Sequence, residues 1–268
     1  MSKKRLDVLL VERNLIESRE KAKRIIMAGL VYSDEMRLDK PGMRVDESIP
    51  LKVKGNDCPY VSRGGLKLEK AIKHFSISME DKRLIDVGSS TGGFTDCALQ
   101  HGAQMSYAID VGYNQLDWKL RSDDRVVVME RTNFRYVTQD MLLKGAPNMA
   151  TIDVSFISLR LILPVLSQLL APNSDVIALI KPQFEAGKDQ VGKGGIVREK
   201  HIHQDVIEHI ISFAQSERYE CLNLTYSPIT GGKGNIEYLV HLGWKTSSSQ
   251  AMTFNIERTV EEAHTALI

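Results

Sequence analysis

From residue 83 onwards, short apolar runs alternate with amphipathic segments in which apolar residues recur every three or four positions. Such runs are typical of strands buried on both faces, and the amphipathic segments predict helices that cover them. The last two runs follow one another without a helix between them, so one of these strands should be antiparallel. We therefore predict an α/β fold on a doubly wound, seven-stranded sheet. Strands are expected at Leu84–Val87, Ser106–Asp110, Val126–Met129, Ala150–Asp153, Val176–Ile180, Cys221–Tyr226 and Tyr238–Leu242, and helices at Thr95–His101, Gln115–Arg121, Leu159–Leu170 and Glu199–Glu217.

Residues 1–60 have a different pattern and are expected to form a small α+β domain. Apolar spacing predicts two helices, and Ser18 and Gly29 stand where the second helix should begin and end. The helices are expected from Leu6 to about Asn14 and over Arg19–Ala28, and strand-like pieces at Leu30–Tyr32 and Ile49–Val53. Proline and glycine then interrupt the pattern. We expect a linker over 61–66, a helix over Leu66–Phe75 that opens a larger domain over 67–245, and a tail over 246–268.

Composition is that of an ordinary globular protein, with 43% hydrophobic and 26% charged residues and a net charge of +1. The basic residues are concentrated early, because residues 1–75 hold 17 Lys/Arg and 11 Asp/Glu. This bias favours contact of the N-terminal domain with a polyanion. Cys58, Cys97 and Cys221 are far apart, which argues for a reducing compartment and against a zinc site. We find no secretory signal and no membrane-spanning segment, so we expect a cytoplasmic protein.

A glycine-rich turn follows the first strand of the larger domain. The spacing DxGxxxGG differs from GxGxxG and favours S-adenosylmethionine over a dinucleotide, since it provides no cradle for a pyrophosphate. Asp110, at the end of the next strand, is suited to bind the ribose hydroxyls. Asn133 is our choice for the adenine edge. The residues expected to hold the methionine part are Asp86, Gly88, Ser89, Ser90, Thr91, Gly92, Gly93 and Phe94.

Basic side chains lie on one side of the second N-terminal helix. The order of helix, glycine turn and strand over residues 5–53, together with these basic positions, resembles the small RNA-binding domain first recognised in ribosomal protein S-four. This resemblance implies that the domain binds structured RNA through phosphate contacts. Further cations near the junction and after the fifth strand are suited to hold RNA above the larger domain. The candidate RNA-binding residues are Arg5, Arg19, Lys23, Arg24, Arg63, Lys188, Lys193 and Arg198.

Four charged residues stand where the fold would bring them together. Asp153 and Lys181 end strands, Glu237 precedes the last strand, and Lys67 lies in the helix before the sheet. In order and context they resemble the Lys-Asp-Lys-Glu tetrad of the FtsJ-like RNA 2′-O-ribose methyltransferases. The strings at 61–68, 181–187 and 190–198 are similar to the TlyA branch of that group, some members of which are described as haemolysins.

The resemblance implies methylation of ribose hydroxyls of cytidine in RNA of the small ribosomal subunit, the large subunit or both. The implied partners are ribosomal RNA or ribosomal subunits, and neither a membrane nor a stable protein partner is implied. Two alternatives are an RNA-binding module with an inactive methyltransferase fold and a membrane-active haemolysin.

The chemistry requires a group that accepts or steers the proton of the ribose hydroxyl, and Lys181 is the candidate base. The carboxylates are expected mainly to orient Lys181 and Lys67, and Asp153 also to lie near the sulfonium and contribute to the cofactor site. His201, His203 and His209 lack partners at ligand spacing, so we expect them at the surface and predict no metal.

Overall fold

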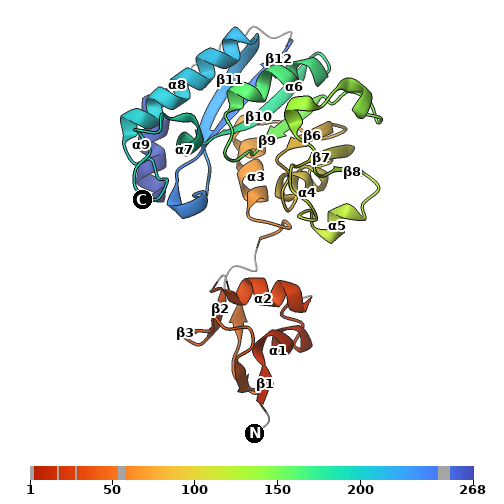
Figure 1. Cartoon of the computed structure of the whole chain (residues 1–268), viewed down its shortest axis with the longest axis vertical. Helices are drawn as coiled ribbons and strands as arrows, with labels where there is room; N and C mark the ends of the chain where they lie inside the picture. Colours follow the sequence, from red (N-terminus) through yellow and green to blue (C-terminus); the bar gives the residue numbers. More distant parts are fainter. Residues whose placement is uncertain (1–2, 17, 28, 54–57, 247–253) are drawn as a thin grey trace. The chain divides into compact units, whose positions relative to one another are not determined.

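The computed structural model describes residues 3–16, 18–27, 29–53, 58–246 and 254–268, except for the Arg24 side chain. The chain divides into two compact units, Met1–Cys58 and Pro59–Ile268, and each is described by itself (Figure 1). The division falls close to the expected end of the N-terminal domain.

The first unit packs two helices on short strands. Leu10 and Ile26, one from each helix, are fully buried in its apolar core. Ser18 accepts a hydrogen bond from the amide of Lys21, and Gly29 has a φ of +71°, so both act at the helix ends where the pattern predicted them. The elements are β1 (Lys3–Arg5), α1 (Leu6–Glu12), α2 (Arg19–Met27), β2 (Val31–Ser33), β3 (Met36–Arg37), β4 (Arg44–Asp46) and β5 (Lys52–Val53).

The second unit is built on a seven-stranded sheet in the order β11-β12-β10-β9-β6-β7-β8. Strand β12 runs antiparallel to β10 and β11, and the other pairs are parallel, which confirms the predicted α/β fold and its reversed strand. The strands are β6 (Arg83–Val87), β7 (Met105–Ile109), β8 (Val126–Met129), β9 (Met149–Ile152), β10 (Ser174–Ile180), β11 (Tyr219–Tyr226) and β12 (Tyr238–Trp244).

Both faces of the sheet are apolar because the central strands are buried on both sides. Ile85 and Val87 belong to a core cluster that also contains Leu166 and Ile207 from covering helices, whereas Leu84 points to the opposite face and is equally buried. The helices are α3 (Gly64–Phe75), α4 (Gly93–Gln100), α5 (Trp118–Arg121), α6 (Leu163–Leu169), α7 (Pro182–Glu185), α8 (Lys200–Ser216) and α9 (Ile256–Leu267). Helices α8 and α9 pack beside β11 (Figure 1).

Two expected helices are shorter than their apolar patterns suggested. Helix α5 begins only at Trp118, because Asn114 has a φ of +56° and Asp117 caps the helix by accepting a hydrogen bond from the amide of Lys119. The segment expected as one helix over Leu159–Leu170 is a 3₁₀ turn at Leu159–Leu161 followed by α6. Pro164 lacks an N–H and is tolerated only in the first turn, so the α-helix starts beside it.

Residues 61–66, expected as a linker between two domains, lie inside the second unit. The amide of Val61 donates a 2.8 Å hydrogen bond to Asp96 on α4, and α3 already begins at Gly64. Gly65 packs so closely on Tyr60 that an added Cβ would lie 2.4 Å from its ring. The tail is also structured in part, since α9 packs on α8 and β11.

Candidate active site

The fold brings four strand ends to one edge of the sheet. Strands β10, β9, β6 and β7 are neighbours and parallel, so the residues that follow them lie side by side. Lys181 follows β10 and Asp153 follows β9. Glu237 reaches the same edge from the opposite direction, because Tyr238 of the antiparallel β12 pairs with Ile180.

These side chains and Lys67 of α3 form one connected quartet. The Nζ atom of Lys67 donates to Glu237 Oε2 at 2.7 Å and to Asp153 Oδ2 at 3.3 Å. The Nζ atom of Lys181 forms an ion pair with Asp153 Oδ1 and donates to Ser155 Oγ at 3.3 Å. Asp153 therefore bridges the two lysines, and the group has two positive and two negative charges.

Burial makes the partners of each charge important. The Lys67, Lys181 and Glu237 side chains are each less than a tenth exposed. Burial by itself lowers the pKa of Lys67, but the charges of Asp153 and Glu237 outweigh it, so the pKa lies above its usual value. For Asp153 burial acts to raise the pKa, and the two lysines outweigh it, so the net shift is downward. Both groups are thus held in their charged forms at neutral pH.

The glycine-rich turn after β6 is shaped by contacts that leave no room for side chains. Gly88 has a φ of +83°, and a Cβ there would lie 2.6 Å from the carbonyl oxygen of Asp153. Asp86 is fully buried and accepts hydrogen bonds from Thr95 N, Thr95 Oγ1 and Thr151 Oγ1. Burial raises the pKa of Asp86 to about 6 despite these donors. Its carboxylate holds the turn against α4, and direct contact with a ligand stays a prediction.

Asp110 and Asn133 lie beyond the turn. Asp110 accepts hydrogen bonds from the amides of Ser90 at 2.8 Å and Gly112 at 2.7 Å, one on each carboxylate oxygen. Each oxygen keeps a further lone pair for a ribose hydroxyl. The Asn133 side chain instead caps a 3₁₀ turn by accepting from the amide of Arg135. Neither residue borders the cavity described next, and their cofactor roles stay predictions.

A cavity of about 780 Å³ opens above the strand ends, in the size range of ligand pockets. It is bordered by the quartet, by Asp86 and Gly88, and by most of the turn, namely Ser89, Ser90, Thr91, Gly93 and Phe94; Gly92 completes the turn with a φ of +96°. The close backbone of the turn fits an adenosyl group, and Asp110 beyond the border stays the predicted partner of the ribose.

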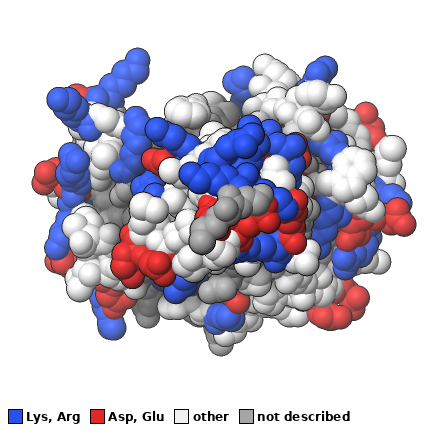
Figure 2. Space-filling model, turned by 90° about the horizontal axis from the view of Figure 1, so that it is seen from below, with Lys and Arg blue, Asp and Glu red and all other residues white. Residues whose placement is uncertain are grey.

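The candidate RNA-binding residues lie in both units. Arg63 borders the cavity, and Lys188, Lys193 and Arg198 are exposed on the segment between α7 and α8. Lys and Arg side chains gather over part of the face in Figure 2, with Asp and Glu beside them.

In the first unit the buried carboxylate of Asp7 accepts from Arg5 and Arg19, whose side chains are about half exposed. The Arg5 guanidinium, with Arg19, lowers the pKa of Asp7 to about 2. Lys23 is partly exposed on α2, and the Arg24 side chain lies outside the described residues.

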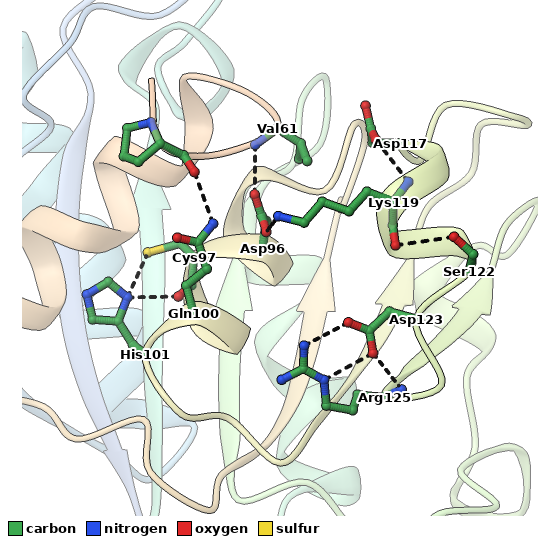
Figure 3. A network of polar contacts seen from close by, with 11 residues as sticks. Val61, Asp96, Cys97, Gln100, His101, Asp117, Lys119, Ser122, Asp123 and Arg125 are labelled. Atoms are coloured by element: carbon green, nitrogen blue, oxygen red, sulfur yellow. Dashed lines mark hydrogen bonds and ion pairs between the residues drawn. The ribbon is translucent and has the colours of Figure 1, made fainter. Parts of the chain in front are cut away.

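A polar network ties the chain before α3 to the helices beside the turn (Figure 3). Asp96 accepts from Val61 N on one carboxylate oxygen and from Lys119 Nζ at 2.9 Å on the other. Gln100 donates to the carbonyl oxygen of Pro59 at 3.0 Å. These contacts fix the start of α3, and α3 carries Lys67 into the quartet.

The histidine expectation is wrong for one residue. His201 and His209 are exposed, but His203 is fully buried, because its side chain on α8 contacts Tyr238 of β12. No group of three or more His, Cys, Asp or Glu in the described part of the chain could hold a metal ion. Over the same residues, we find no helix with the length and apolar character needed to cross a membrane.

Sequence reasoning missed several residues at the cavity. Ser155 contacts Lys181. The ring centres of Phe156 and Phe184 lie 4.9 Å apart at the border of the cavity. Ser155 and Phe156 directly follow Asp153, a signal that could have been used. Asn235 also borders the cavity, is buried and joins two loops there. No local sequence pattern predicts that role.

Comparisons with known proteins identify the families to which the two parts of the chain belong. The model of the FtsJ-like methyltransferases matches residues 60–244, and that of the S4 domain matches residues 4–48. YqxC of Bacillus subtilis is 65% identical over 268 residues, which cover 99% of this chain and 95% of YqxC. Hemolysin A of Brachyspira hyodysenteriae is 43% identical over 237 residues, 88% of this chain and 98% of its own. The 16S/23S rRNA (cytidine-2′-O)-methyltransferase TlyA of Mycobacterium tuberculosis is 38% identical over 262 residues, 96% of this chain and 97% of TlyA.

The family match extends over the whole sheet and over the helix that carries Lys67, and the S4 match lies within the first unit. The FtsJ-like match confirms S-adenosylmethionine as the cofactor that the spacing of the glycine-rich turn predicted. The chain belongs to the FtsJ-like methyltransferase family and carries an S4 domain in its N-terminal unit.

Proposed function

We propose that this protein methylates the 2′-hydroxyl of a cytidine ribose in ribosomal RNA, of the small subunit, the large subunit or both. The observation that carries the proposal is the quartet of Lys67, Asp153, Lys181 and Glu237 at the border of the cavity. The relative TlyA, similar over nearly its whole length, is named for this reaction on 16S and 23S rRNA.

When bound, S-adenosylmethionine would supply an electrophilic methyl group to the ribose oxygen. The glycine-rich turn and Asp110 would hold it. The chain's other task is to hold the hydroxyl in line and to remove its proton, and alignment supplies much of the rate.

Lys181 is the candidate group for the proton. An ammonium that is paired with Asp153 has no lone pair, so Lys181 must lose a proton before it can act as a base. In its charged form it would instead orient the hydroxyl oxygen. Glu237 holds Lys67, Lys67 holds Asp153, and Asp153 therefore holds Lys181 in place.

The S4 domain would bind RNA through phosphates, since Arg5 and Arg19 are held side by side by the buried Asp7. Arg63 at the cavity, together with Lys188, Lys193 and Arg198, would hold RNA near the quartet. Such contacts position the substrate without reading its sequence.

The test is Lys181→Ala, with methyl transfer to ribosomal subunits and cofactor binding by calorimetry measured on the full chain. We expect loss of methyl transfer with nearly unchanged cofactor affinity. Lys82→Ala is the matched control, because Lys82 pairs with Asp175 at 3.1 Å, away from the cavity, and should keep activity. Full activity of Lys181→Ala would remove this lysine from the mechanism.

Two rival functions have distinct outcomes. A chain that binds RNA but shows no cofactor binding in calorimetry would be an RNA-binding module with an inactive sheet domain. A membrane-active haemolysin would release dye from liposomes as purified protein.

A further inference from the structure

Two loops border the cavity from the side of β12. One is Gly192–Val197, between α7 and α8, and the other is Gly231–Glu237, which leads into β12 and contains a 3₁₀ turn at Gly232–Gly234. Gly194 and Gly195 of the first loop lie at the cavity border. They have φ values of +84° and +77°, so this loop has a backbone that few other residues would adopt.

A single buried side chain joins the two loops. Asn235 is 3% exposed, and its Nδ2 donates to the carbonyl oxygens of Gly195 at 2.9 Å and Gly232 at 3.1 Å. Its Oδ1 accepts from the amide of Val197 at 3.2 Å. The amide group therefore uses both its donor and its acceptor side, and it binds the loop Gly192–Val197 at two points.

The far end of the same loop is held by His203. This fully buried histidine contacts the carbonyl oxygen of Val197 through Nε2 at 3.0 Å and the hydroxyl of Tyr238 through Nδ1 at 2.7 Å. A carbonyl oxygen only accepts, so Nε2 must carry the proton and Nδ1 accepts from Tyr238. Both backbone polar groups of Val197 are thus bound by side chains.

We propose that Asn235 is a positioning residue that fixes the loop Gly192–Val197 over the catalytic cavity. The loop places Lys193, and Arg198 follows directly after it, so its position sets where these two cations meet RNA. The hydrogen bonds of the Asn235 side chain go to the two loops and not to the quartet, so it acts through the loop. This inference rests on the proposed function for its effect on RNA, but the fixing of the loop stands on the hydrogen bonds alone.

Asn235→Asp is the sharp variant, because it keeps the shape and the acceptor for Val197 N but loses the donor. A carboxylate would face the carbonyl oxygens of Gly195 and Gly232 and repel them. Asn235→Ala removes all three hydrogen bonds. Asn148→Ala is the matched control, since the Asn148 side chain accepts from the amide of Arg83 at the opposite edge of the sheet.

Two measurements on the full chain test the proposal. In hydrogen exchange and limited trypsin digestion, we expect both Asn235 variants to exchange the Val197 region faster and to be cut faster after Lys193 and Arg198, and Asn148→Ala to match the wild type there. In methyl transfer, we expect KM for ribosomal RNA to rise roughly 10-fold, with kcat and cofactor affinity changed little, since the lost interactions bind substrate uniformly.

Unchanged exchange and cleavage in Asn235→Asp would overturn the proposal, as would an unchanged KM in an active variant. If Asn235→Ala fails to fold, the isosteric Asn235→Asp decides. A wild-type protein without methyl transfer to ribosomal RNA would refute the proposed function instead, and exchange and cleavage would still judge whether Asn235 fixes the loop.

Discussion

Removal of the Glu237 charge is the most direct perturbation of the quartet. In Glu237→Gln the side chain keeps its size, but Lys67 loses the carboxylate that lies 2.7 Å from its Nζ and keeps only Asp153, which it shares with Lys181. The Lys67 and Glu237 side chains are 9% and 3% exposed, so water can reach the lost partner's place only from the cavity and replaces it poorly. Burial would then lower the pKa of Lys67 with less opposition.

The size of the effect follows from this geometry. At 2.7 Å and an effective dielectric constant of about 20, the attraction is about 6 kcal/mol before the cost of desolvation is subtracted. Removal of one partner of a buried ion pair costs about 3–5 kcal/mol. Because Asp153 still contacts Lys67, we expect a loss near the lower end, about 3 kcal/mol of unfolding free energy at pH 7. We also expect kcat to fall about 100-fold as the lysines shift.

Urea unfolding followed by tryptophan fluorescence reports on the unit that contains the quartet, because Trp118 and Trp244 both lie in the second unit. The stabilising contribution of Lys67 is present below its usual pKa of 10.5 and is lost as the pH rises above it, so the difference between the two proteins should shrink at alkaline pH. Glu262→Gln, which breaks an exposed pair with Arg258 on α9, should cost less than about 0.5 kcal/mol. Equal stability and equal kcat in Glu237→Gln and wild type would refute the reasoning.

Two further predictions concern buried titratable groups. Asp7→Asn should lower the protection of α1 amides in hydrogen exchange by about 2 kcal/mol at pH 7. The charged Asp7 carboxylate, whose pKa is lowered to about 2, stabilises the fold above pH 3.8, and this stabilisation is lost as the pH falls towards 2. Unchanged protection would contradict this prediction. For His203, burial lowers the pKa from 6.5 to about 4, so the wild type should lose about 3 kcal/mol of unfolding free energy from this group as the pH falls through that window. The difference in unfolding free energy between wild type and His203→Gln should narrow by that amount on acidification. Protonation of Asp86, whose pKa is raised, stabilises both proteins equally in this range and cancels in the difference. A difference independent of pH would exclude a stabilising role for neutral His203.

The positions of the strands could be read from apolar runs because a buried parallel strand must be apolar on both faces. The same logic anticipated that Asp153 and Lys181 lie together, since their strands end at one edge. Helix ends were less predictable. Pro164 and Asp117 moved two of them because single side chains decide where the first backbone hydrogen bonds form.

The sequence by itself thus determined the fold class, the glycine-rich turn and the identity of four charged residues. Only the tertiary structure decided that Lys67 and Glu237, two of the four residues expected in one group and 170 positions apart, pair directly at 2.7 Å, that His203 is buried, and that Asn235 joins two loops. The physical reason is that periodicity records which face of a strand or helix is buried. The partner that a polar side chain meets depends instead on strand order and on the register of β12 against β10, which the local pattern does not encode.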